Sequence, residues 1–77
     1  MPEELFNVVQ FFMDETYEYV RRNVSAEEAV KAAAHYTGSP AALLGITIEV
    51  MITDQGDQCV FRWIRGKGIV WPKKEAS

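Results

Sequence analysis

The stretch from residue 59 to residue 74 combines aromatic and cationic side chains in a way that could hold a nucleic acid. Its sequence, CVFRWIRGKGIVWPKK, contains two tryptophans and five basic residues. Aromatic rings can stack on bases and cations can neutralise phosphates, so single-stranded nucleic acid is the ligand that this composition would fit. The candidate contacts are Arg62, Arg65, Lys67, Trp71, Lys73 and Lys74.

A half-buried strand accounts for the same interleaving without any ligand. Side chains alternate between the two faces of a strand, so Phe61 and Trp63 would face a core while Arg62 faces water. The glycines in the following "RGKG" lack the longer frame and the helix of a phosphate-binding loop, and they are typical of a hairpin turn. We therefore favour the structural explanation and keep nucleic-acid binding as the alternative.

The sequence offers no constellation for catalysis or for a metal. His35 and Cys59 are the only members of their classes, and a nucleophile–base pair would need them within hydrogen-bond reach. Cys59 is expected to be a small apolar core residue. Asp54 and Asp57 fall in "DQGD", which is turn chemistry rather than a calcium loop. We predict no enzyme, no catalytic or metal-binding residue and no cofactor.

The first element expected is a helix over about residues 2–23. Pro2 suits a first helical position, and acidic residues follow it while Arg21 and Arg22 come at the other end, as the helix dipole favours. On a helical wheel its apolar residues span roughly 180°, more than the about 100° that one neighbour requires. We interpret this as contact with a further surface, such as a second subunit. Phe11 lies across the wheel near Glu15 and Glu18, and these three are the predicted partner contacts.

A second helix and a short helical turn are predicted next. "SAEE" at residues 25–28 is a capping box, in which Ser25 caps the helix and Glu28 follows three residues later. The helix should end near Thr37 and Gly38, because glycine is the common C-terminal residue. "SPAALLG" then predicts one helical turn capped by Ser39 and ended by Gly45.

Three strands complete the chain. "ITIEVMIT" and "QCVFRWIR" alternate as hairpin strands around "DQGD", and "IVWP" follows the glycine turn as a short last strand. Apolar matching sets the expected register. It pairs Ile52 with Cys59, Val50 with Phe61, Ile48 with Trp63 and Glu49 with Arg62.

The predicted fold class is α+β: two N-terminal helices, plus a short helical turn, packed on a three-stranded antiparallel β-meander. One domain should occupy residues 1–77. Its parts would be a helical hairpin over 1–38, a connector over 39–45, the meander over 46–72 and a frayed tail over 73–77.

Charge and composition favour a protein partner. The net charge is −3; residues 1–40 carry seven acidic and three basic side chains, and residues 41–77 carry four and five. No apolar run approaches the ~18 residues of a membrane span, and the acidic start is unlike a signal peptide, so a soluble cytoplasmic protein is expected. We predict a small non-enzymatic protein-binding or accessory protein, with a homodimer through the first helix as one form. The alternative is a nucleic-acid-binding regulatory protein that uses the basic, aromatic C-terminal sheet.

Overall fold

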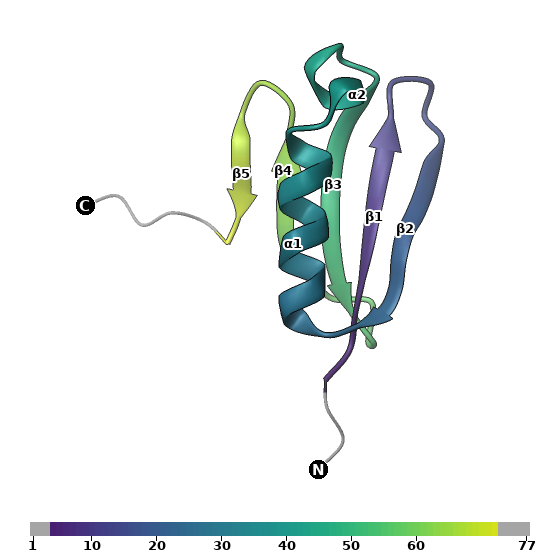
Figure 1. The fold of residues 1–77 in the computed structure, drawn as a ribbon, viewed down its shortest axis with the longest axis vertical. Helices are drawn as coiled ribbons and strands as arrows, with labels where there is room; N and C mark the ends of the chain where they lie inside the picture. Colours follow the sequence, from purple (N-terminus) through teal and green to yellow (C-terminus); the bar gives the residue numbers. More distant parts are fainter. Residues whose placement is uncertain (1–3, 73–77) are drawn as a thin grey trace, which may run out of the picture.

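The chain folds as a five-stranded antiparallel sheet with one helix of three turns on a single face (Figure 1). The computed structural model describes residues 4–72. The elements in order are β1 (Phe6–Phe12), β2 (Tyr17–Val24), α1 (Ala26–Thr37), α2 (Pro40–Leu43), β3 (Thr47–Asp54), β4 (Cys59–Ile64) and β5 (Gly68–Trp71). The strands lie in the order β2-β1-β3-β4-β5, so β3 is central.

The predicted first helix, and with it the helical hairpin over residues 1–38, is wrong. Its described part forms the β1–β2 hairpin, which turns at Asp14 and Glu15. The Asp14 carboxylate accepts hydrogen bonds from the backbone N–H and the hydroxyl of Thr16, and Glu15 has a φ of 71°. Its apolar residues are mostly phenylalanine, tyrosine and valine, which favour strands over helices.

The misleading helical pattern has a structural cause. β1 is buried on both faces, because Val8 and Val9 are 0% and 3% exposed. Bulges interrupt the pairing of β1 with β2, so the alternation of a half-buried strand is lost. Adjacent apolar residues on two faces then imitate the wide apolar arc of a helix.

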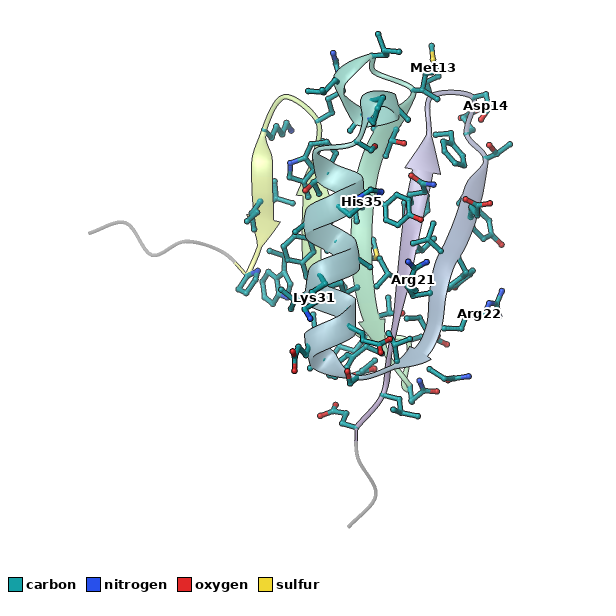
Figure 2. All side chains as sticks on the ribbon, viewed as in Figure 1. Met13, Asp14, Arg21, Arg22, Lys31 and His35 are labelled. Carbon is teal, nitrogen blue, oxygen red and sulfur yellow. The ribbon has the colours of Figure 1, made fainter. Side chains whose placement is uncertain are left out.

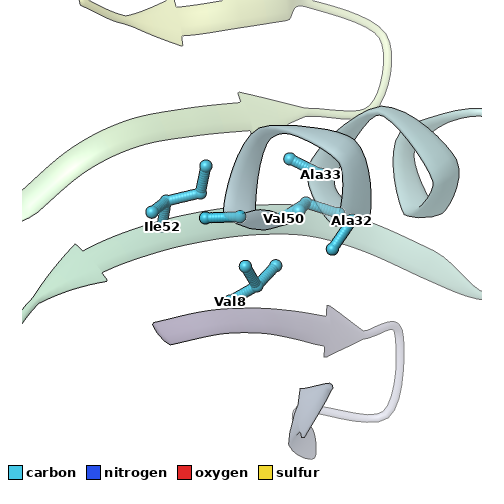
Figure 3. Close-up of a cluster of buried hydrophobic side chains, with 6 residues drawn as sticks. Val8, Ala32, Ala33, Val50 and Ile52 are labelled. Atoms are coloured by element: carbon cyan, nitrogen blue, oxygen red, sulfur yellow. The ribbon is translucent and has the colours of Figure 1, made fainter. Parts of the chain in front are cut away.

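α1 is the element that the sequence predicted best. The Ser25 side chain accepts a hydrogen bond from the backbone N–H of Glu28 at 3.2 Å, and the helix ends before Gly38. α1 packs on β1, β2 and β3. Its alanines Ala32 and Ala33 meet Val8, Val50 and Ile52 from the sheet in the core (Figure 3).

The helical turn α2 is also confirmed. The Ser39 side chain accepts from the N–H of Ala42 at 3.2 Å, and Pro40 occupies the first turn. Gly45 ends the segment with a φ of +83°, a conformation that glycine adopts without strain. Neither helix in residues 4–72 combines the length and apolar character of a bilayer-crossing segment.

The three C-terminal strands are confirmed, but their register differs from the expected one by two residues. The observed partners are Val50 with Trp63, Ile52 with Phe61 and Met51 with Arg62. A bulge between Phe61 and Cys59 absorbs one residue, and the turn is held by Asp54, whose carboxylate accepts from the N–H groups of Gly56 and Gln58. A shift of two keeps a side chain on the same face, so Phe61 and Trp63 lie on the helical side as predicted. Beyond the bulge the shift is one residue, so the prediction that Cys59 is a core residue is wrong: it pairs with Thr53 on the other face and is only half-buried. The predicted tail over 73–77 lies outside the described residues.

Candidate protein interfaces

His35 and Cys59 lie on opposite faces of the sheet. His35 is in α1, where its ring packs edge-on against Tyr36 beside Lys31 and Arg21 (Figure 2). Cys59 pairs with Thr53 on the face without the helix, and its thiol donates to the carbonyl of Phe61 at 3.3 Å. Among the described residues no three His, Cys, Asp or Glu side chains are placed to bind one metal ion.

The basic residues predicted to contact a nucleic acid make different interactions and do not all lie on one surface. Arg62 Nε donates to Glu49 Oε2 at 2.6 Å, and this bond raises the pKa of the guanidinium above its usual value. Arg65 Nε donates to the carbonyl of Ala42 at 3.1 Å, so it fastens the β4 end to α2. Arg62, Lys67 and Trp71 line one shallow depression on the face without the helix. Lys73 and Lys74 lie outside the described residues.

The three residues predicted to contact a protein partner do not form one surface. The Phe11 ring lies 6.0 Å from that of Tyr17 on the face without the helix. Glu15 is exposed in the β1–β2 turn. Glu18 accepts a hydrogen bond from Gln10 at 3.1 Å, on the helical side. Of the three, Phe11 belongs to an extended aromatic surface.

The helical side carries an apolar groove beside α1. Five strands spaced ~4.8 Å apart are about 24 Å wide, whereas a helix with its side chains is about 10 Å wide. α1 rests on β1, β2 and β3, so β4 and β5 are left open beside it. We name this space the helix groove; it is lined by Phe6, Ala26, Ala29, Val30, Ala33, Ala34, Thr37, Ile52, Val60, Phe61, Trp63, Gly68, Ile69 and Glu4.

The helix groove runs along the whole of α1. Its hollow at the C-terminal end of α1 holds about 540 Å³, and the one at the N-terminal end holds about 370 Å³. Val30, Ile52 and Phe61 line both hollows, which makes them continuous. Glu4 is the only charged residue among the described lining residues. The groove is therefore an apolar surface with an acidic end.

The other side of the sheet is a second apolar surface, which we name the open face. It carries Val9, Phe11, Tyr17, Tyr19, Arg22, Glu49, Met51, Cys59, Arg62, Ile64 and Trp71, together with the polar residues Asn7, Thr53 and Lys67. Tyr17 and Tyr19 pack edge to face at 6.0 Å, and Arg22 Cζ lies 4.3 Å from the centre of the Tyr19 ring. Tyr17, Tyr19 and Trp71, at the two edges, are 61%, 39% and 48% exposed.

Sequence reasoning singled out Phe11 and Trp71 but missed Tyr17, Tyr19 and Ile69. Tyr17 and Tyr19 were read as part of a helix, although "YEY" is also a strand alternation. Ile69 lies at the groove and Trp71 on the open face of the same strand. The alternation of "GIVW" contained that signal, because a strand sends such residues to one face or the other.

Comparisons of the chain with models of protein families, with curated proteins and with solved structures found no match. The geometry itself presents two apolar surfaces, one on each side of the sheet. Large apolar surfaces of this kind are typical of interaction sites. The helix groove and the open face are the two candidate interfaces.

Proposed function

We propose that the protein is a non-enzymatic protein-binding module that holds an amphipathic helix of another polypeptide in the helix groove. The observation that carries the proposal is the apolar groove that runs beside α1 over the uncovered strands β4 and β5. Laying the apolar face of a helix into such a groove is a recurring mode of peptide recognition.

The dimensions of the groove favour a helix of about three turns. α1 has 12 residues, and at ~1.5 Å per residue it is about 18 Å long. The two open strands, about 10 Å wide by the same strand spacing, match the width of one helix. Ala33, Ala34 and Gly68 are small residues in the groove wall, so they leave room for bulky apolar side chains of the partner.

The helix of a second copy does not fit this role. The apolar side of α1 is already packed on its own sheet through Ala29, Ala32 and Ala33. The side that remains free carries the exposed pair of Glu27 and Lys31, 3.5 Å apart. Since α2 has only four residues, no helix within residues 4–72 has a free apolar face to offer. The partner must therefore supply its own helix.

Charge favours one orientation of the partner helix. Glu4 lies at the end of the groove beside the N-terminus of α1. An antiparallel partner would place its C-terminus there, where a lysine or arginine would be stabilised by Glu4 and by its own helix dipole. The chemistry we propose is an apolar face with a basic C-terminal turn.

A displayed library of random peptides, each about 14 residues or three to four helical turns long, is the probe. We expect selection on the wild-type protein to enrich apolar residues at spacings of three and four, with basic residues at the C-terminal end. Ile69→Glu should weaken the selected peptides at least about tenfold, because it puts a carboxylate in the groove. Leu43→Glu, at an exposed position outside both surfaces, is the control and should bind normally. Enrichment without helical spacing, or equal binding by Ile69→Glu, would contradict the proposal.

A second candidate function is the binding of single-stranded nucleic acid on the open face. It is supported by Arg62, Lys67 and Trp71, which share one depression. It is opposed by the net charge of −3 and by Glu49, which neutralises Arg62. Anisotropy of a labelled oligouridylate at low and high salt tests it, because phosphate contacts strengthen as salt is lowered. We expect no binding at low salt; binding that Lys67→Glu abolishes would favour this second function.

A further inference from the structure

We propose that the open face packs against the open face of a second copy, so that the protein forms a face-to-face homodimer through its sheets. This interface differs from the dimer through a first helix that the sequence suggested, and it is independent of the helix groove. No described helix covers this side of the sheet (Figure 1). Yet it carries exposed aromatic side chains at both edges, namely Tyr17 and Tyr19 on β2 and Trp71 on β5.

The charge of the open face favours another protein surface, rather than a nucleic acid, as its partner. Glu49 and Arg62 neutralise each other at 2.6 Å. Among the described residues, Arg22 on β2 and Lys67 in the β4–β5 turn are then the remaining charged side chains of the face. A phosphate backbone requires several cations along its path. Two cations at different strands do not form such a path, and a largely apolar face matches the same face of a second copy.

The strand order makes the face self-complementary. Because β3 is the middle strand, a two-fold axis that runs parallel to β3 between the two sheets would set β2 over β5 of the second copy. The same axis would set β1 over β4. By the strand registers Tyr19 lies level with Trp71, so the exposed ring of Tyr19 would then meet Trp71 of the second copy. Arg22, which already stacks on Tyr19, would come close to that indole ring as well. Two twisted sheets pack in this aligned manner in β-sandwiches.

The area of the face is that of a modest, reversible dimer. A sheet about 24 Å wide, with strands about 20 Å long, presents roughly 500 Å² per copy, or about 1,000 Å² in total. Specific interfaces begin near this size. We therefore expect a monomer–dimer equilibrium that depends on protein concentration.

Sedimentation equilibrium over a wide concentration range tests the proposal on the whole chain. We expect reversible dimerisation by the wild type and by Leu43→Glu, and dissociation constants at least about tenfold higher for Trp71→Glu and for Tyr19→Glu. Two substitutions at opposite edges are used so that a folding defect in one variant does not decide the result, and circular dichroism verifies the fold of each. A monomer at every concentration would overturn the proposal, as would a dimer that both variants leave unchanged.

Cys59 supplies a second readout, because it is the only cysteine and lies on the open face. Its alkylation by iodoacetamide should slow as wild-type protein concentration rises, and should stay constant for Trp71→Glu. A labelled oligouridylate serves as the competing ligand. If it binds wild type but not Trp71→Glu while the protein remains monomeric, the open face is a nucleic-acid surface and the homodimer is wrong. If the protein does not dimerise, the proposal about the helix groove still stands, because peptide selection tests binding on the other side of the sheet.

Discussion

Thr47 is a buried polar residue whose hydroxyl depends on the neighbouring Gln10 side chain for a hydrogen-bond acceptor. Its side chain is fully buried, and its hydroxyl donates to Gln10 Oε1 at 3.0 Å. Gln10 Nε2 in turn donates to Glu18 at 3.1 Å, so one side chain connects three neighbouring strands. A buried hydroxyl without an acceptor costs about 1–3 kcal/mol.

We predict that Gln10→Met lowers the free energy of unfolding by about 1–3 kcal/mol, because it leaves the Thr47 hydroxyl unsatisfied. Adding Thr47→Val should recover part of that loss, since both partners are then apolar. Urea unfolding of the two single variants and the double variant gives the coupling energy. Strictly additive losses would show that the hydroxyl finds another acceptor.

Asp14 gives the β1–β2 turn a pH dependence. The hydroxyl of Thr16, and then its backbone N–H, hold the pKa of the Asp14 carboxyl below its usual value of 3.8. A depressed pKa in the folded state stabilises the fold above the unfolded value, and this contribution is lost as pH falls through the folded value. We predict that Thr16→Ala raises the Asp14 pKa toward 3.8, measured by carboxyl-carbon NMR titration. An unchanged pKa would assign the effect to the backbone N–H alone.

At the scale of elements, those set by local contacts could be predicted from the sequence, and those set by tertiary contacts could not. The caps Ser25 and Ser39 act within three residues of themselves, so sequence alone located both helical starts. β1 depends on distant partners on each side, and bulges break its alternation. The register of β3 and β4 depends on the bulge before Phe61, and no residue type in that stretch predicts a bulge.

The cap of α1 offers a direct test at this scale. Ser25→Ala removes the acceptor for the N–H of Glu28 and should lower the free energy of unfolding by about 1 kcal/mol. Ser25→Asp keeps an acceptor at the cap and should be nearly neutral. Thermal unfolding of both variants measures the difference, and equal losses would contradict the role of the cap.

The burial of β1 on both faces yields a further prediction. Val8→Ala and Val9→Ala should each lower the free energy of unfolding by about 2 kcal/mol, because each removes two buried methyl groups. Val30→Ala, at an exposed position on α1, should change it by less than about 0.5 kcal/mol. Denaturant unfolding compares the three. A neutral Val9→Ala would show that water reaches Val9 from the open face.

At the scale of the whole molecule, the error about the first helix hid the candidate site. Two helices of the predicted length would cover a three-stranded sheet, and no groove would remain. Because residues 6–24 instead add two strands, one helix must cover five strands and leaves β4 and β5 open. Individual groove residues such as Phe61 and Trp63 were correctly assigned to the helical side. That the helix leaves these residues partly uncovered follows from the strand topology, which cannot be derived from composition and periodicity.

The opposed positions of the two surfaces make a prediction about their complex. A dimer through the open faces would turn both helix grooves outward, so peptide binding and dimerisation should be independent. We expect a selected groove peptide to bind wild-type dimer as a 2:2 complex, and Trp71→Glu as a 1:1 complex with the same affinity. Ile69→Glu, two residues earlier on the opposite face of β5, should dimerise normally and bind no peptide. Calorimetry and mass measurement of the complexes give both quantities; a 2:1 complex, or a peptide that dissociates the dimer, would mean that the two surfaces overlap.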